Sequence, residues 1–443
     1  MKRTNAIFFM ITVFLWFFLF STFSTGLFAQ IDNLTNMSAE WIQMCNRNAA
    51  TDAADIVIYN PAGLTRLTNG FHLNLSNQTL IRKPEHSFDL GIGLGSETYG
   101  QDSPDPFLPN FYAAYKKDKW VLFGGVYIPG GGAVVDYPQG SISTKLMGLT
   151  LLPVFAGVYD YFKDDALEAS SLYLTTTLGA AYAISDTVSL AAGVRYIKAR
   201  NTMKVKITMM DTSGVIPDTA LRVDFKDTAD GFGLVFGMNI SPSPKLNIGI
   251  RYESKVKLEF ETDVIEDSFN GLFVIDGAKS RRDFPGMLGM GMSYQISSKV
   301  RTELDFNYFF QKQADWGTVL TGTGEQEYSE LAGNCWSLGA SLIYQACSRL
   351  QLSGGFIYTK FDFQDIDLYY TNTGAFEVLY SDNLNLGLGF SYEILKSVKL
   401  NLGFSTTLWK DETIKALVAF PLDADVQTNN AGYALAVGLD ISF

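Results

Sequence analysis

The chain has 443 residues, of which 47% are hydrophobic and 18% are charged, and its formal net charge at pH 7 is -12. This composition is too apolar for a disordered chain and is sufficient for a large folded core. The negative charge argues against a nucleic-acid partner, because phosphate binding needs clustered Lys and Arg. After residue 20 no stretch approaches the ~20 continuous apolar residues of a transmembrane helix, which excludes a helical membrane bundle.

The N-terminus has the pattern of an export signal. Lys2 and Arg3 form a basic start, residues 6–20 form an apolar core, and a small and polar region ends at Ala29. We therefore expect residues 1–29 to be a cleaved signal peptide. The alternative is a single-pass membrane anchor, which the short apolar run disfavours.

Residues 30–69 lack any strand pattern but carry several apolar side chains, including Trp41, Ile56 and Tyr59. A disordered tail normally has fewer such anchors. This segment precedes the first predicted strand, and a wide barrel leaves interior space that side chains alone do not fill. We therefore expect residues 30–69 to enter the lumen as a plug.

From about residue 70 onward, apolar residues alternate with small or polar ones, which places alternate side chains on opposite faces of a strand. Counting these segments predicts about fourteen strands between residues 70 and 443, with starts that include positions near residues 172 and 431. Short links alternate with long links along the chain, as periplasmic turns and extracellular loops do. The sequence thus predicts an all-β fold, a transmembrane antiparallel β-barrel. A soluble β-sandwich is the alternative, but its strands are usually only ~5–6 residues long.

A motif before the first strand carries a resemblance to a known family. Asn60, Pro61, Ala62 and Gly63 follow a small and polar run, and residues 53–64 together resemble the plug motif of the FadL/TodX-like family of outer-membrane long-chain fatty acid and hydrocarbon transporters. Residues 127–131, 243–257 and 283–294 resemble later family segments. The resemblance covers about residues 45–443.

The resemblance implies a fourteen-strand barrel in the outer membrane of a Gram-negative type cell, plugged by its N-terminal segment and working passively without a cofactor. It implies capture of a long-chain fatty acid or other hydrophobic molecule by the loops, binding in the lumen, and lateral exit into the membrane lipid at a kinked third strand. The terminal Phe443 resembles the signal that the barrel assembly machinery reads.

The third predicted strand is apolar on both faces, so its lumen side suits a lipid. Two adjacent glycines within it predict a bend, because Gly weakens strand pairing. We therefore expect a lumen and lateral-gate site at Phe123, Gly124, Gly125 and Tyr127.

Two further sets of candidate residues follow. The longest predicted loop is unusually apolar for an exposed segment, which indicates a ligand-capture site or a lid at Leu149, Leu151, Val154 and Phe155. Inward strand parity makes Arg195 and Arg251 possible contacts for a carboxylate, although salt bridges within the lumen are their more common role.

Other functions remain as alternatives. A general diffusion porin would show a charged constriction and no plug, and a surface-exposed adhesive or structural barrel would use its long loops for binding. A phospholipase needs a Ser and His pair, but His72 and His86 have no nucleophile motif nearby. We expect no enzymatic activity, no metal and no cofactor.

Overall fold

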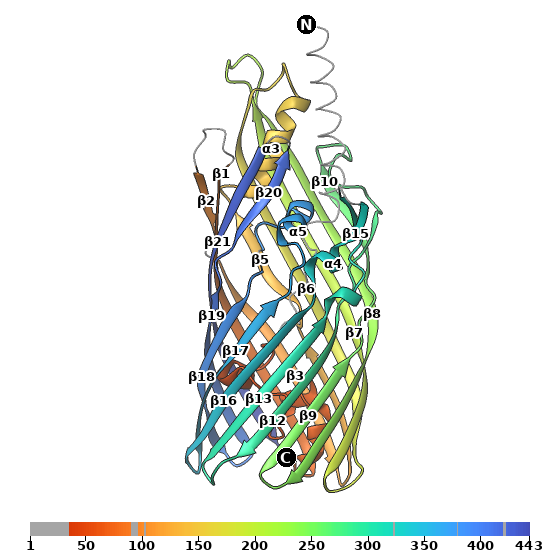
Figure 1. Cartoon of the computed structure of the whole chain (residues 1–443), viewed down its shortest axis with the longest axis vertical. Coiled ribbons are helices and arrows are strands. Elements are labelled where there is room, and N and C mark those ends of the chain that lie inside the picture. Colours follow the sequence, from red (N-terminus) through yellow and green to blue (C-terminus); the bar gives the residue numbers. More distant parts are fainter. Residues whose placement is uncertain (1–34, 90–95, 102, 322–323, 379, 420–421) are drawn as a thin grey trace.

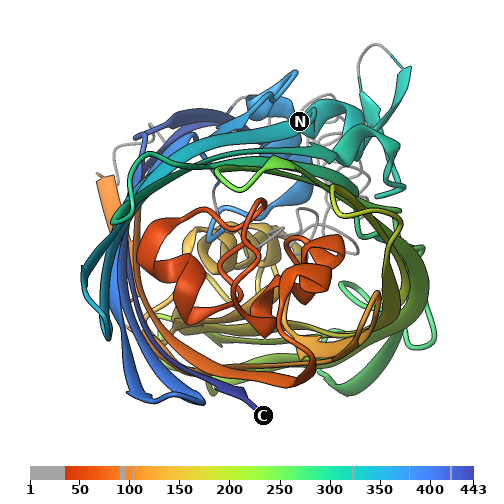
Figure 2. The same ribbon diagram turned by 90° about the horizontal axis from the view of Figure 1, so that it is seen from below.

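The protein, described here from a computed structural model, is an antiparallel β-barrel that closes around an N-terminal segment (Figures 1 and 2). The structure describes residues 35–89, 96–101, 103–321, 324–378, 380–419 and 422–443. Over these residues the barrel has 14 strands, as the alternation predicted. A search of the same ranges for a helix of membrane-spanning length and hydrophobicity finds none. The expected signal peptide lies outside the described residues.

Several barrel strands are built from more than one segment. The elements up to the middle of the chain are α2 (Ala39–Met44), η2 (Ala54–Val57), η3 (Pro61–Arg66), β1 (Gly70–Asp89), β2 (Ser96–Gly100), β3 (Ser103–Lys117), β4 (Trp120–Tyr127), β5 (Gly131–Tyr137), α3 (Ile142–Val154), β6 (Tyr161–Ala183), β7 (Val188–Met210) and β8 (Thr219–Ser243).

The second half continues the same meander, with short helices in its loops. Its elements are β9 (Leu246–Glu253), β10 (Glu259–Asp267), β11 (Lys279–Arg281), β12 (Gly286–Gln295), β13 (Val300–Phe310), η4 (Gln311–Gln313), β14 (Thr318–Thr321), β15 (Gly324–Glu327), α4 (Tyr328–Ala332), β16 (Cys335–Cys347), β17 (Leu350–Phe361), α5 (Ile366–Thr373), β18 (Asn383–Leu395), β19 (Val398–Trp409), β20 (Thr413–Ala419) and β21 (Leu422–Ser442).

The barrel closes between its first and last strands. β1 pairs antiparallel with β21 in a continuous register that runs from His72 opposite Ser442 to Asp89 opposite Asp425. The terminal residue extends this contact, because the backbone N–H of Phe71 donates to the carbonyl of Phe443 at 2.7 Å. No strand edge is left at the seam, which is what a bilayer requires of a β-structure.

Several strands begin earlier than the alternation indicated. β6 begins at Tyr161, against a predicted start near residue 172, and β21 begins at Leu422, against residue 431. Each of these extensions lies at the end of the barrel away from the short turns (Figure 1). Ladder hydrogen bonds continue there, but the exposed positions include polar residues such as Glu168, so the period-two hydrophobic signal that marks a membrane strand is lost.

Residues 35–69, which we call the plug segment, lie inside the lumen in the half of the barrel that carries the short turns (Figures 1 and 2). The largest buried cluster joins plug side chains such as Ile42, Ile58 and Leu64 to the inward-facing wall residues Tyr112 and Phe123. The main core of this protein therefore lies between the plug segment and the wall, in the place where a porin has water.

Candidate functional site

Glycines on the inner face of the wall make room for the plug segment. A Cβ atom at Gly387 would lie 2.5 Å from the carbonyl of Ile42, and one at Gly403 would lie 2.9 Å from the carbonyl of Ala39. Backbone and wall approach this closely only where the wall residue has no side chain. The same contact is made to plug residues by Gly237, Gly249, Gly291, Gly355 and Gly438.

The plug motif has a clear local role. The side chain of Asn60 accepts from the N–H of Gly63 at 3.2 Å and donates to the carbonyl of Ala50 at 3.0 Å and to Asn239 of β8 at 2.8 Å. It therefore caps η3 and also ties the plug to the wall. Pro61 occupies the first position of η3, where its missing N–H costs nothing. Ala62 is fully buried.

Buried ion pairs fix the rest of the plug segment. Arg47 forms a two-point contact with Asp55, with distances of 2.9 and 2.5 Å, and its other nitrogen lies 2.9 Å from Asp52. Asp52 also bonds Arg301 of the wall at 2.8 Å. Burial alone would raise the pKa of Asp52, but the two arginines outweigh it and hold the pKa well below its usual value.

A cavity of about 260 Å³ lies between the plug segment and the extracellular loops. Asn36 and Trp41 line it from the plug, and Glu377 lines it from the loop before β18. Its wall residues mix apolar and amide side chains, among them Leu80, Val135, Ile357, Asn385, Thr407 and Trp409. A half-open, partly apolar cavity of this kind is a candidate small-molecule site.

The third barrel strand is broken, but not at the glycines where the sequence predicted a bend. Gly124 and Gly125 pair in regular register with both neighbours, β3 and β6. The break comes after Tyr127, at residues 128–130, where β4 ends and β5 begins with Gly131 at φ 67°. Pro129 lacks the N–H that a ladder needs at that point, which is why the strand stops there.

This break opens the wall between β3 and β5. β3 pairs with β4 only over residues 111–117, and the described part of residues 103–110 forms no ladder with β5. Side chains connect the two edges instead. Gln101 donates to the carbonyl of Val134 at 2.6 Å and accepts from the N–H of Asp136 at 3.0 Å, and Asp105 accepts from the N–H of Val134 at 3.1 Å.

The cavity reaches this gap, because Gln101, Val134 and Val135 line it. Apolar side chains surround the outside of the gap: Phe107 is 69% exposed and Val134 is 43% exposed. The break therefore lies between a lumen cavity and an outer surface that carries exposed apolar side chains.

The four expected gate residues lie beside the gap and not at its edges. Phe123 and Tyr127 point inward and are buried, and the Tyr127 hydroxyl bonds Thr177 at 2.8 Å. A Cβ at Gly125 would lie 2.6 Å from the ring of Tyr112, which itself donates to the carbonyl of Met37 in the plug. These residues support the plug next to the gap, whereas Gly124 faces outward against Leu178.

The apolar segment that was expected to be a capture loop is a helix. α3 is capped by Ser141 and Thr144, which bond each other's backbone N–H groups. Leu151 is fully buried and Leu149 packs against two loop clusters, while Val154 is 42% exposed. The first turn contacts the cavity lining, because Glu377 accepts from the N–H and the hydroxyl of Ser143 at 3.0 and 2.8 Å.

Both candidate arginines face the lumen and are buried, and both contact Glu253. Arg195 forms an ion pair with Glu253 and donates to the carbonyl of Ser254 at 2.7 Å. Arg251 lies 3.5 Å from Glu253 and 5.9 Å from the ring of Tyr59. Arg251 keeps a buried Nη1 with no hydrogen-bond partner among the described residues, but it does not line the cavity.

Sequence reasoning missed Gln101, Asp105 and Glu377, which hold the edges of the gap and the top of the cavity. No local pattern marks Gln101 or Glu377, because their partners are distant in the sequence. The break itself did have a signal, since Pro129 is followed by three glycines.

The family profile described as "Outer membrane protein transport protein (OMPP1/FadL/TodX)" matches residues 160–443, well over half of the sequence. The chain belongs to this family. It is accordingly an outer-membrane protein, and the family that the sequence resembles is confirmed, on residues 160–443, which lie after the plug motif. A search of curated protein sequences finds no match.

Solved structures of FadL and TodX proteins share the fold. A Pseudomonas aeruginosa FadL homologue superposes with a TM-score of 0.63 at 13% identity, covering 94% of this chain and 100% of its own. The Pseudomonas putida toluene transporter TodX gives 0.62 at 12% identity, with coverage of 94% and 100%. The Ralstonia pickettii toluene transporter TbuX gives 0.56 at 14%, with coverage of 96% and 100%.

Proposed function

We propose that this FadL/TodX family member is a channel for passive uptake of small hydrophobic molecules, which leave the lumen sideways between β3 and β5. The observation that carries the proposal is the cavity above the plug, which is lined by Gln101, Val134 and Val135 at the open edge of β5. A molecule in that cavity lies next to an apolar outer surface, so its transfer into lipid needs no passage through water. The substrate class includes long-chain fatty acids and monoaromatic hydrocarbons, and no enzymatic activity is assigned.

The plug segment supports lateral over axial exit. Residues 30–69 form the plug in this proposal, residues 70–443 form the barrel, and residues 1–29 are the signal peptide. Plug backbone packs directly on wall glycines, and ion pairs such as Arg47 with Asp55 are fully buried. Removing one partner of a buried pair is strongly destabilising, so this packing resists the displacement that axial passage requires.

We assign ligand access to α3 and the loop that carries Glu377. The exposed Val154 at the end of α3 offers an apolar surface, whereas Leu149, Leu151 and Phe155 hold the helix on the loop core. Arg251 is the remaining candidate for a ligand carboxylate, through its unpaired Nη1. A general diffusion porin is the second function, and the packed lumen disfavours it.

The test is to close the gap. The third strand has four steps from Tyr127 to Gly131, where β6 has three from Thr175 to Leu172, so β4 and β5 are separated by one extra residue. Deleting Gly130 and replacing Pro129→Val lets β4 continue into β5 and pair with β3. Uptake of a fluorescent fatty acid and of toluene into liposomes should fall to the level of empty vesicles.

Binding of the same fluorescent fatty acid in detergent should persist, and so should the heat-modifiable mobility of a folded barrel. The single change Pro129→Val, which keeps the extra residue, is the matched control. Native uptake by the closed variant would contradict lateral exit here.

A further inference from the structure

A second break interrupts the wall on the other side of the barrel, after β9. β8 pairs with β9 only as far as Val235 opposite Glu253, and resumes pairing with β10 at Thr228 opposite Glu261. Between these points residues 254–258 turn into the lumen. Val256, Leu258 and Phe260 are all fully buried there, in a cluster with Tyr173 and Phe284.

Two glycines of β8 allow this inward turn. A Cβ at Gly233 would lie 2.7 Å from Val256, and one at Gly231 would overlap the carbonyl of Lys257. Because the chain passes inside the wall, it leaves a groove of about 1010 Å³ on the outer face. The apolar side chains of residues 254–258 point into the lumen, so the groove is lined mainly by polar and charged side chains.

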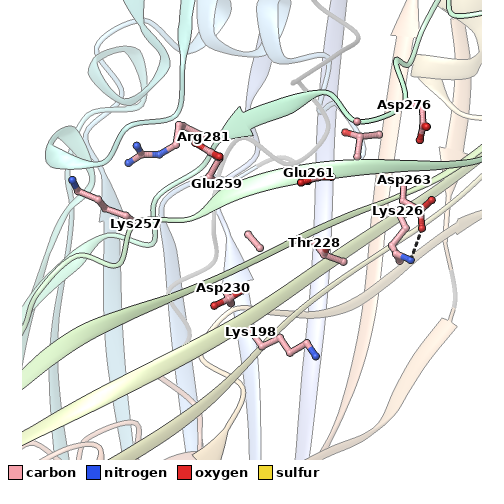
Figure 3. Close-up of a pocket in the computed structure, with 13 residues that line it drawn as sticks. Lys198, Lys226, Thr228, Asp230, Lys257, Glu259, Glu261, Asp263, Asp276 and Arg281 are labelled. Atoms are coloured by element: carbon pink, nitrogen blue, oxygen red, sulfur yellow. Dashed lines mark hydrogen bonds and ion pairs between the residues drawn. The ribbon is translucent and has the colours of Figure 1, made fainter.

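The groove lining is charged (Figure 3). Its cations are Lys198, Lys226, Lys257 and Arg281, and its carboxylates are Asp230, Glu259, Glu261, Asp263 and Asp276. Two cations are already paired: Lys226 bonds Asp263 at 2.7 Å, and Arg281 bonds Asp283 at 2.6 Å. Lys198 and Lys257 have no ion-pair partner among the described residues, and Figure 3 shows them on opposite sides of the groove.

The position of the groove along the barrel axis indicates which part of the membrane lies beside it. In the β7–β8 ladder the backbone of Lys198 lies opposite that of Asp230. Two residues closer to the short turns, Tyr196 lies opposite Phe232, and their rings are 4.8 Å apart on the outer face. Below them Val194, Leu234 and Phe236 are exposed to the outside. An aromatic pair above an apolar band marks the membrane interface, so the groove lies at the level of the outer-leaflet headgroups.

We propose that this groove binds the phosphorylated sugar headgroup of an outer-leaflet glycolipid. Lys198 and Lys257 supply point charges for phosphate groups. Glu259 and Asp263 already bond Lys279 and Lys226, so Glu261 is the groove carboxylate proposed to accept hydrogen bonds from sugar hydroxyls. A bare phosphate would have no use for that carboxylate. A bare metal ion is not favoured either, since no metal-binding group of side chains occurs in the described residues. The acyl chains would lie on the apolar band below.

The experiment measures binding of fluorescent lipid A, the acylated diphosphoryl glucosamine disaccharide, to the full-length barrel in detergent. The double variant Lys198→Ser with Lys257→Ser should bind at least about tenfold more weakly than the native protein. The matched control is Lys163→Ser with Lys204→Ser, which removes two exposed lysines outside the groove and should bind as the native protein does.

Two further arms separate the sources of phosphate. Dephosphorylated lipid A should bind the native protein as weakly as lipid A binds the groove variant, and inorganic phosphate at millimolar concentration should not compete. Equal binding by groove and control variants overturns the proposal, and so does full competition by inorganic phosphate. Heat-modifiable mobility confirms that each variant is folded, and fatty acid uptake should be unchanged.

Discussion

The barrel wall is interrupted twice by the same device, an inward departure of one strand, yet the two openings differ in what surrounds them. At the break after β4, the outer rim carries Phe107 and Val134, and a cavity lies directly inside. At the break after β9, the outer rim carries Lys198 and Lys257, and the inside is filled by Val256 and its neighbours.

The difference shows that a break in a barrel wall does not by itself make an exit. The first opening joins a lumen cavity to an apolar surface, and a hydrophobic molecule can cross it without contacting water. The second opening is sealed on the inside by apolar packing and is charged on the outside. The side chains on each face of the break, and its height relative to the lipid, determine its use.

The largest effect on uptake should come from placing charged side chains at the break after β4, where the break after β9 already has them. In the variant Phe107→Glu with Val134→Glu, each carboxylate would replace an exposed apolar side chain on the proposed exit route. Liposome uptake of a fluorescent fatty acid should fall about tenfold, the effect of ~1.4 kcal/mol on a rate. The groove variant Lys198→Ser with Lys257→Ser serves as control and should transport normally. Equal uptake by both would remove the distinction between the openings.

A second change tests whether the lumen is closed along its axis. Gly355 faces the plug, and a Cβ there would overlap the carbonyl of Met44, whereas Gly354 faces outward. Gly355→Val should displace α2 and raise ion conductance in planar bilayers several-fold, while Gly354→Val should leave conductance unchanged. If Gly355→Val conducts like the native protein, the plug segment does not block the axial path.

A third prediction concerns pH at the top of the cavity. Burial raises the pKa of Glu377, although hydrogen bonds from Ser141 and Ser143 oppose the shift. The raised pKa belongs to the arrangement in which Glu377 bonds Ser143 of α3. The stability that it adds to this contact is therefore complete below the ordinary pKa of a glutamate. That stability is lost as pH rises through the raised value. Fatty acid uptake should therefore increase over that interval, and Glu377→Gln should flatten the profile.

The smallest effect should follow the loss of one bridging side chain at the gap. Gln101→Ala removes the acceptor of the Asp136 N–H and a donor to Val134. Amide exchange at Asp136 should become about fivefold faster, because a net hydrogen bond contributes ~1 kcal/mol. Exchange at Ala169, which pairs with Val135 on the far side of β5, is the internal control and should not change. Unchanged exchange at Asp136 would show that another group holds the edge.

The sequence predicted the features that follow from the alternation of membrane strands. It missed the features that depend on contacts between residues far apart in the chain. Strand number and the paired short turns follow from alternating side chains, and the plug motif was recognisable because Asn60 and Pro61 act within a few residues. The bend was placed at Gly124 and Gly125 since glycines weaken strands, but both are held by regular ladders on two sides.

The loop residues show the same limit. Leu149 and Leu151 were read as an exposed surface, but they lie on a helix whose capping signal, Ser141 followed by Thr144, was present in the sequence. Whether Leu151 faces solvent depends on Phe162 and Met147, which the fold brings beside it. Arg195 and Arg251 were correctly placed inward, yet their contacts with Glu253 depend on the register of β7, β8 and β9.

The packing of the plug against wall glycines also constrains the order of assembly. α2 is among the earliest segments to be synthesised, but the glycines that receive it, Gly387, Gly403 and Gly438, belong to β18, β19 and β21 at the end of the chain. Its docking site therefore does not exist until the final strands have paired. We therefore expect the plug segment to dock last, after more than three hundred later residues have been made and the final strands have paired.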